Sequence, residues 1–378
     1  MEEIMIDDLT TFRRELHQNP EVSQNETETQ RRIIEFLNKI GVEGRKIGGT
    51  GVYVDFNTSR KGKTIMLRSD HDALPIHEIN DFEHKSKKDG VSHKCGHDGH
   101  TAIMCGVADY FKHNPLSQGR LILIFQPAEE NGEGAKAVLA DKQFNFNPDL
   151  VFALHNLPGY PLHEVVVKED SFTSAAKSII IKLDGKTSHA AEPEKGINPA
   201  MTISELVTMF EEEAQPDWKR DDFALTTPIF INMGELSYGV SAGHGEVHYT
   251  LRTWSNEIME ELTNRIMVRI DAIAAKYDIQ ASISWTEAFE SNRNDSKAVK
   301  IIKEAIAANL LNSEERTWPF KWGEDFGLFT QKFPGAMFGI GSGENCPALH
   351  NPDYDYPDEI TETGIKMFTV IVEKAINE

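Results

Sequence analysis

Residues of the types that bind metals gather in a few short stretches of this sequence. Cys95 and His97 lie one residue apart in a glycine-containing loop, where a thiolate and an imidazole can bind a borderline-soft cation from one side. On its own, this spacing favours a buried thiol beside a hydrogen-bonded histidine. Glu129 and Glu130 are more informative, because adjacent carboxylates directly after an apolar run are costly unless a cation or a proton lies between them.

The glutamate pair suits a division of labour in which one carboxylate binds a metal while the other takes a proton from a metal-activated water. A solvated acidic turn is the alternative. His155 and His350, each unremarkable alone, add enough ligands for two cations about 3.5–4 Å apart. A thiol hydrolase with Cys95 as nucleophile and His97 as base would leave the glutamate pair unexplained, and residues one apart rarely reach that geometry.

The apolar patterning predicts the elements that position these residues. Short, nearly continuous apolar runs predict buried strands, and helical spacing of apolar residues predicts helices. Strands are expected at 51–56, 64–70, 121–127, 150–156 and 336–341, and helices before Pro20, before Gly41 and over 101–113, 296–310 and 358–376. This alternation predicts an α/β domain with a largely parallel sheet. Molecules and ions that bind to such sheets lie beyond the carboxyl ends of the strands, which is where Glu129, Glu130 and His155 fall.

The middle of the chain has a different pattern. From residue 172 it reads strand, helix, strand, strand, helix, strand, which predicts a small ferredoxin-like α+β sandwich. The strands are expected at 178–185, 228–236, 246–253 and 281–288, and the helices at about 198–214 and 256–277. We therefore expect a first domain built from 1–171 and 288–378, interrupted by an insert over 172–287.

Composition excludes several classes of protein. The 378 residues exceed what one compact domain usually holds, and no apolar run approaches the roughly 20 residues that span a bilayer. The acidic start does not resemble a signal peptide, so we expect a cytoplasmic protein that is not bound to a membrane. The net charge of −21 argues against nucleic-acid partners. Three cysteines without paired spacing indicate reduced thiols.

Seven motifs, spread over residues 68–359, resemble those of the metallo-aminoacylase/carboxypeptidase family and come in that family's order. Within it, the match is to the branch with hippurate hydrolases, auxin-conjugate amidohydrolases and N-acetyl-diaminopimelate deacetylases. The motifs are RSDHDALPIHE (68–78), HKCGHDGHTA (93–102), FQPAEENGEGA (125–135), ALHNLP (153–158), GKTSHAAEP (185–193), WGEDF (322–326) and LHNPDYDYPDE (349–359).

The resemblance implies a zinc-peptidase-like catalytic domain with two divalent metal ions and an inserted lid domain that commonly forms a homodimer. By position, the implied metal ligands are Cys95, which would bridge the two ions, His97, Glu130, His155 and His350. Glu129 would be the general base, and Asp72 and Asp98 would orient the ligands. His189, in the lid loop, would stabilise the oxyanion, often from the neighbouring subunit.

The function that the resemblance implies is metal-dependent hydrolysis of the amide bond of N-acyl amino acids or similar small conjugates. Zinc, manganese, cobalt and nickel all suit the implied ligands. A metallo-dipeptidase or carboxypeptidase is the alternative. A non-catalytic metal-binding or peptide-binding descendant is disfavoured, because storage needs ligands but no free base such as Glu129.

Some positions depart from the family's pattern or have an open role. His71 stands where the family usually has methionine, so the ligand set would differ if this side chain faces the metals. Residues 238–253 lack the usual Asn-Val-Ile-Pro segment, although Arg252 remains as a candidate substrate-binding residue. His244 and its neighbouring glycines either shape a different pocket or form a flexible hairpin turn. Glu324 either contributes to the site or only begins a helix.

Overall fold

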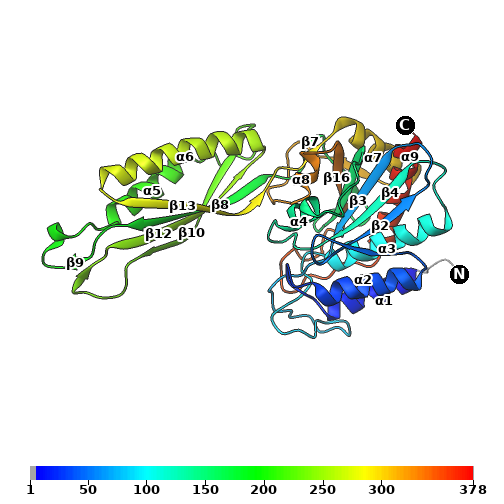
Figure 1. Cartoon of the computed structure of the whole chain (residues 1–378), viewed down its shortest axis with the longest axis horizontal. Helices are drawn as coiled ribbons and strands as arrows, with labels where there is room; N and C mark the ends of the chain where they lie inside the picture. The colour runs from blue at the N-terminus through cyan, green and yellow to red at the C-terminus, as the bar shows by residue number, and fades with distance from the viewer. Residues whose placement is uncertain (1–5, 378) are drawn as a thin grey trace. The chain divides into compact units, whose positions relative to one another are not determined.

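The computed structural model describes residues 6–377 (Figure 1). Residues 1–5, on which the expectation about a signal peptide partly rests, lie outside this range. In the described chain, none of the helices has the length and apolar character needed to cross a membrane. The chain divides into two compact units, of which the first comprises the chain up to Phe172, Asn292–Thr317 and the chain from Glu324 onward.

The described residues of the first unit form an eight-stranded sheet. Across the sheet the strands are β1 (Arg45–Ile47), β2 (Gly51–Asn57), β4 (Arg120–Gln126), β3 (Thr64–Asp70), β5 (Leu150–Leu157), β16 (Gly335–Gly341), β6 (Val165–Val167) and β15 (Ser313–Glu315). Each neighbouring pair among β4, β3, β5 and β16 is parallel, whereas β2 and β6 join this centre antiparallel. The predicted α/β class with a largely parallel sheet is confirmed.

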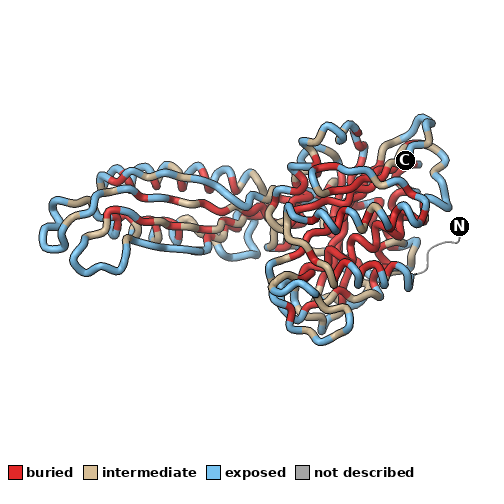
Figure 2. Tube along the Cα trace, turned by 60° about the horizontal axis from the view of Figure 1, so that its bottom comes forward, coloured by how far each residue is buried: buried red, intermediate tan, exposed pale blue. Residues whose placement is uncertain are grey.

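The central strands are buried on both faces, as their continuous apolar runs predict. Leu121 and Leu123 of β4 enter one core together with helical residues, while Ile122 and Ile124 are equally buried on the opposite face. Figure 2 shows that the buried residues gather in the interior of this unit. The helices of this unit are α1 (Ile6–Gln18), α2 (Thr27–Lys39), α3 (His97–His113), α4 (Gly134–Ala140), α7 (Ser296–Ala308), α8 (Gly327–Thr330) and α9 (Ile360–Asn377). Helices α3 and α9 contact β3, and α4 contacts β4.

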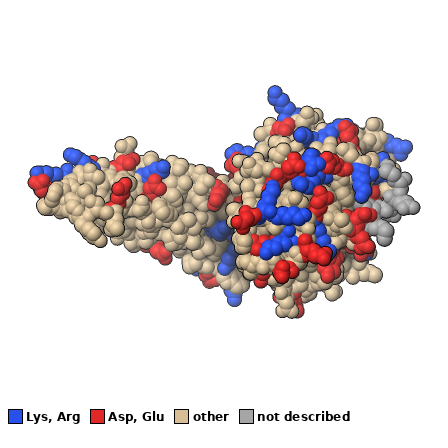
Figure 3. Space-filling model, turned by 90° about the horizontal axis from the view of Figure 1, so that it is seen from below, with Lys and Arg blue, Asp and Glu red and all other residues tan. Residues whose placement is uncertain are grey.

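The surface of the first unit mixes charges of both signs. Basic and acidic side chains lie among one another on the face drawn in Figure 3, without a large basic field. The first unit also contains the short pair β7 (Asp170–Ser171) and β14 (Arg293–Asn294), which the sequence reading did not include.

The second unit is the α+β sandwich that the middle of the chain predicts. It contains β8 (Ala175–Asp184), α5 (Ala200–Glu213), β10 (Ala224–Met233), β12 (His244–Thr253), α6 (Asn256–Lys276) and β13 (Gln280–Phe289). The strands form an antiparallel sheet in the order β10-β12-β8-β13. Helices α5 and α6 share its core, where the rings of Phe210 and Tyr249 stack with centroids 3.9 Å apart.

The segment Trp318–Gly323 packs with the second unit, although the sequence predicts that residues 288–378 belong to the first domain. Backbone and side-chain hydrogen bonds hold this segment to the second unit. The backbone N–H of Ser174 donates to Phe320 O at 3.0 Å, and the Ser174 hydroxyl donates to Lys321 O at 2.7 Å. The side chain of Arg252 also donates to Lys321 O. These long-range bonds carry no local sequence signal.

Candidate metal centre

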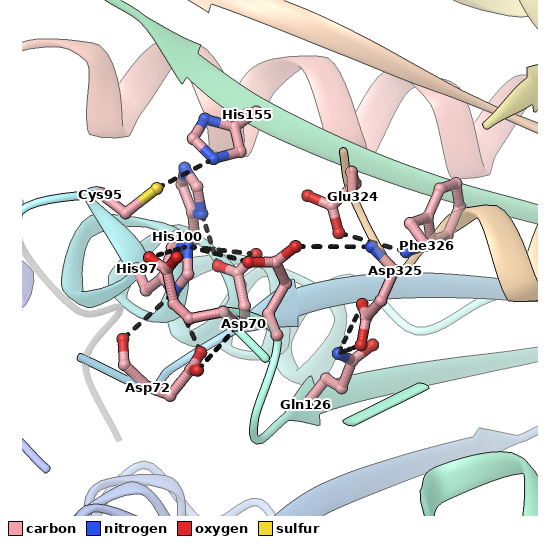
Figure 4. Close-up of polar contacts among 12 residues, drawn as sticks. Asp70, Asp72, Cys95, His97, His100, Gln126, His155, Glu324, Asp325 and Phe326 are labelled. Atoms are coloured by element: carbon pink, nitrogen blue, oxygen red, sulfur yellow. Dashed lines mark hydrogen bonds and ion pairs between the residues drawn. The ribbon is translucent and has the colours of Figure 1, made fainter. Parts of the chain in front are cut away.

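The candidate site lies at one edge of the large sheet, where parallel strands end together. Strand β3 ends at Asp70, β4 ends just before the Glu129–Glu130 pair, and β5 carries His155 near its end. Because β4, β3 and β5 are parallel neighbours, their carboxyl ends share one edge. Helix α3 begins at His97 and delivers the Cys95–His97 loop to the same place (Figure 4).

The bend after β4 explains how two adjacent glutamates turn toward one centre. Neighbouring side chains on a straight strand point to opposite faces. Here Ala128 adopts a left-handed backbone conformation with φ of 51°, and its N–H donates to Glu26 Oε1 at 2.8 Å. A Cβ at Gly134 would come within 1.7 Å of Pro127 O, so the close packing of this bend requires glycine there.

The structure brings the predicted ligands and the predicted base together. Cys95 Sγ lies 3.5 Å from His155 Nε2. Glu130 Oε1 lies 3.9 Å from His97 Nε2, and its Oε2 atom lies 3.5 Å from His350 Nε2. In three overlapping groups, the potential ligand atoms all lie within 4.8 Å of one another. These groups are Cys95 with His97 and His155, Cys95 with Glu130 and His350, and His97 with both Glu129 and Glu130.

Asp72 makes the contacts expected of a residue that orients a ligand. Its Oδ1 atom lies 3.1 Å from His97 Nδ1, which leaves Nε2 of that ring directed at the cluster. Its Oδ2 atom accepts hydrogen bonds from the backbone N–H of Glu130 and from the hydroxyl of Ser23. The carboxylate of Asp72 therefore fixes the positions of two predicted ligands, His97 and Glu130.

The residues present fit a bound cation. Within the described chain, His97 Nε2 and Glu130 Oε1 are buried without a hydrogen-bond partner. Burial raises the pKa of Glu130 to about 8. Burial also raises the pKa of Glu129 well above its usual range, and the charges of Glu324 and Glu130 raise it further. A cation between these groups would satisfy the unpaired atoms and offset the repulsion between the carboxylates. Thiolate, imidazole and carboxylate together suit a divalent transition metal.

The electrostatics of Cys95 disfavour a thiol nucleophile. Burial first, and then the carboxylates of Glu130, Glu129 and Asp70, raise the pKa of the thiol well above its usual range. A nucleophilic cysteine needs the opposite, a pKa lowered by nearby positive charge. A bound cation would stabilise the deprotonated thiolate of Cys95 here.

The predicted base, Glu129, lies beside a second acidic cluster. Glu324 and Asp325 offer oxygens within 4.8 Å of a Glu129 oxygen, and the backbone N–H of Asp325 lies 3.4 Å from Glu129 Oε1. Arg68, fully buried, pairs with Glu324 at 2.8 Å, with Asp325 at 2.7 Å and with Asp70 at 2.6 Å. Sequence reasoning left the role of Glu324 open and assigned none to Arg68, although both stand in the recognised motifs.

Asp98 makes none of the contacts to a metal ligand that the resemblance implies. Its carboxylate faces α1, where Oδ2 lies 2.9 Å from His17 Nδ1 and 3.3 Å from Arg13 Nη1. Consecutive residues on a helix diverge by about 100°, so Asp98 and His97 cannot both face the centre. The contacts therefore connect Asp98 to a buried charged cluster under α1, which the sequence reading did not foresee.

Two further histidines near the centre have different surroundings. His71 is buried, and both ring nitrogens are without a hydrogen-bond partner in the described chain, yet it belongs to none of the potential ligand groups. Burial lowers the pKa of His71 to about 4. His100, which sequence reasoning missed, lies close enough to Asp70 and His97 to form a further group. Its position three residues after His97 on a helix was the available signal.

The other candidate residues belong to the second unit. His189 is exposed and lies in β9 (Ser188–His189), which pairs with β11 (Val240–Ser241). His244 is exposed at the start of β12. Arg252 is partly buried, and burial lowers the pKa of its guanidinium. The structure thus places His189 beside the 238–253 segment, which departs from the family pattern.

Comparisons with known proteins agree with the motifs. The family model described as peptidase family M20/M25/M40 matches residues 66–374. The N-acetyl-L-cysteine deacetylase of Bacillus subtilis is 32% identical over 361 residues, covering 94% of this chain and 84% of the relative. The N-acetyldiaminopimelate deacetylase of Anoxybacillus flavithermus is 31% identical over 369 residues, covering 95% of each chain.

Solved structures show the same fold. The YXEP protein of Bacillus subtilis, described as a dinuclear metal binding peptidase from the M20 family, is 27% identical and superimposes with a TM-score of 0.85 over 98% of both chains. A putative aminohydrolase from methicillin-resistant Staphylococcus aureus has a TM-score of 0.89 at 23% identity, covering 98% of this chain and 97% of that one. The family match spans most of the chain, so this protein belongs to peptidase family M20/M25/M40, a family of metallohydrolases that act on amide bonds.

Proposed function

We propose that this protein is a two-metal amidohydrolase that removes the acyl group from N-acyl amino acids or similar small conjugates. The observation that carries the proposal is the pair of adjacent glutamates, Glu129 and Glu130. Glu130 faces the imidazoles of His97 and His350, while Glu129 contacts the acidic cluster of Glu324 and Asp325 and is left as a base. The names of the two deacetylase relatives support the substrate class.

The roles of the residues follow from their positions. Cys95, His97, Glu130, His155 and His350 would hold two divalent cations. When bound, the cations would lower the pKa of a water molecule and polarise the amide carbonyl. Glu129 accepts the proton of the attacking water and returns it to the leaving amine. Burial first, and then the neighbouring carboxylates, raise the pKa of Glu129, which strengthens it as a base.

His189 is our candidate for stabilising the oxyanion. Its Nδ1 atom accepts a hydrogen bond from the backbone N–H of Ala191 at 3.0 Å. This bond selects the tautomer that carries the proton on Nε2, so the exposed edge of the ring presents a hydrogen-bond donor. A donor aimed at the developing negative charge on the carbonyl oxygen is what the reaction requires. Arg252 and His244, from the same unit, are candidates for contacting the rest of the substrate.

We also propose that the second unit forms a homodimer through β10. This strand lies at an edge of its sheet, and Ile229, Phe230, Ile231 and Met233 are all exposed. Leu236 and Tyr238, in the loop that follows, are 90% and 92% exposed. The face of this unit in Figure 3 carries few charged side chains. An edge strand with exposed apolar side chains is a template for pairing with another chain.

Light scattering would test the dimer. We expect Ile231→Lys to yield a monomer, whereas Leu310→Lys, which changes an exposed apolar residue of the first unit, should leave the dimer intact. A monomeric unmodified protein would contradict the proposal.

The three cysteines are unpaired in the described chain, which supports a reducing, cytoplasmic location.

A substrate panel would distinguish hydrolysis of N-acyl amino acids from a peptidase activity. The panel would contain N-acetyl and N-benzoyl amino acids together with dipeptides, assayed with zinc, manganese, cobalt or nickel. We expect turnover of acyl amino acids to exceed that of dipeptides. The opposite preference would favour the dipeptidase or carboxypeptidase alternative. Bound metal without turnover of either class would favour the non-catalytic descendant.

A further inference from the structure

Asn156, which directly follows His155 in β5, holds a buried polar network that the proposed reaction does not use. Its side chain is fully buried. The Nδ2 group donates to the hydroxyl of Tyr354 at 2.6 Å, and Oδ1 lies 2.7 Å from His100 Nε2. One amide therefore joins β5, helix α3 and the loop that carries His350.

The network occupies both nitrogens of His100. Nδ1 lies 2.6 Å from Asp70 Oδ1, and Nε2 lies 2.7 Å from Asn156 Oδ1 and 3.2 Å from the backbone N of Asn156. His100 could bind a metal only by breaking one of these contacts. Although His100 lies near His97, the geometry makes it part of the framework around the ligands (Figure 4).

Asn156 also contacts the ligand side chains through its backbone and its packing. Its carbonyl oxygen lies 2.8 Å from His155 Nδ1, which directs Nε2 of that ring toward Cys95. A Cβ at Gly96 would lie 2.4 Å from Asn156 Oδ1 and 2.8 Å from the Tyr354 hydroxyl. The loop between Cys95 and His97 therefore packs directly on this amide, and only glycine permits the approach.

The loop of His350 is tied to the same place. The backbone N–H of His350 donates to Lys94 O at 2.7 Å, and the Lys94 ammonium donates to Tyr354 O at 2.7 Å. The Tyr354 hydroxyl then accepts from Asn156. Three segments that are distant in sequence, and that carry Cys95, His155 and His350, thus converge on one buried side chain.

We propose that Asn156 is a positioning residue whose side-chain amide sets the relative placement of the Cys95–His97 loop, His155 and the His350 loop. It contacts neither the cations nor the substrate in this account. The inference rests on the metal centre described under Proposed function. Because hydrogen-bonded partners of metal ligands typically contribute a factor of about 10–100 in affinity, the loss of this amide should be measurable as weaker metal binding.

The test compares three variants for binding of Zn²⁺ in competition with a chromophoric chelator. Asn156→Leu removes both hydrogen bonds of the amide at similar volume, and Tyr354→Phe removes only one. Asn294→Leu is the matched control, because Asn294, in β14, is a buried asparagine of the same unit that bonds to Lys168 O and to Met337 O of β16. The absorption spectrum of the Co²⁺-loaded protein reports the coordination geometry independently of activity.

We expect Asn156→Leu to weaken Zn²⁺ binding about 10–100-fold and to change the Co²⁺ spectrum. Tyr354→Phe should act in the same direction by a smaller factor, and it decides the test if Asn156→Leu does not fold. Asn294→Leu should lower thermal stability and leave both metal readouts unchanged.

Two results would overturn the inference. The first is metal affinity and a Co²⁺ spectrum equal to those of the unmodified protein in both Tyr354→Phe and any folded Asn156→Leu. The second is an equal loss of affinity in Asn294→Leu, which would indicate general destabilisation. Failure of the unmodified protein to bind Zn²⁺ would instead contradict the proposed function, so the two failures are distinguishable.

Discussion

Replacing Glu324 by Gln should move the acid limb of the pH–activity profile to lower pH. Burial raises the pKa of Glu129 above its usual range, and among the charged groups Glu324 is the largest further cause. Glu129 acts as a base only when it is deprotonated, so kcat/KM falls as the pH drops through its pKa. Removing the negative charge of Glu324 lowers that pKa and extends activity to lower pH.

The magnitude follows from the distance between the two carboxylates. Their oxygens lie within 4.8 Å of each other. At an effective dielectric constant of about 20, two unit charges at that distance repel by about 3.5 kcal/mol. Bound cations screen part of this repulsion. We therefore expect the acid limb to move to lower pH by less than the unscreened repulsion would give, together with a lower maximal rate because Glu129 becomes a weaker base.

The assay is kcat/KM for an N-acyl amino acid measured across pH, with metal content determined for each preparation. Asp55→Asn is the matched control, because Asp55 is a carboxylate of the same unit that is ion-paired with Arg120 and lies outside the acidic cluster. It should leave the acid limb in place. An acid limb that is unchanged or moves to higher pH in Glu324→Gln, with metal content intact, would refute the assignment of Glu129 as the titrating base.

Three further outcomes follow from the structure. Asp72→Ala should weaken Zn²⁺ binding about 10–100-fold in a competition titration, because His97 loses the partner that orients it; unchanged affinity would contradict this role. His189→Ala should lower kcat by about 10²–10³ and change KM little if the ring stabilises the oxyanion; a change confined to KM would indicate substrate binding instead. Burial lowers the pKa of His17, but Asp98 and Glu78 outweigh it and raise the value to about 9. A pKa raised on folding stabilises the protein fully below the unfolded value of about 6.5, and this contribution is lost as pH rises through about 9. The melting temperature of His17→Gln should therefore approach that of the unmodified protein at high pH, and a gap independent of pH would contradict the assignment.

Much of the fold could be predicted from the sequence, because the buried strands and amphipathic helices have long, distinct apolar patterns. Strands β3, β4 and β5 and helix α3 occupy the regions expected from their runs. Short elements could not be predicted. Strand β15 has three exposed residues, Ser313–Glu315, and no apolar period, so only its pairing with β6 defines it. The packing of Trp318–Gly323 with the second unit likewise depends on long-range hydrogen bonds.

The candidate site could be predicted where residue type and position after a strand coincide. Glu129, Glu130 and His155 stand at such strand ends, Cys95 and His97 stand in the loop that begins α3, and the structure brings them together. The residues that position these side chains could not be predicted, because their roles depend on hydrogen-bond partners far along the chain. Asn156 bonds to a tyrosine 198 residues away, and His17 bonds to Asp98 at a separation of 81 residues. No local pattern indicates such pairings.

The central claim, a two-metal hydrolase with Glu129 as its base, is tested most directly by one paired measurement. Metal content per chain and turnover of an N-acyl amino acid would be determined for the unmodified protein, for the chelated protein and for Glu129→Gln. We predict about two metals per chain and activity that is lost on chelation and regained with added metal. Glu129→Gln should retain the metals and lose turnover, because the ligands remain and the base does not. Activity that survives metal removal, or full activity in Glu129→Gln, would contradict the account.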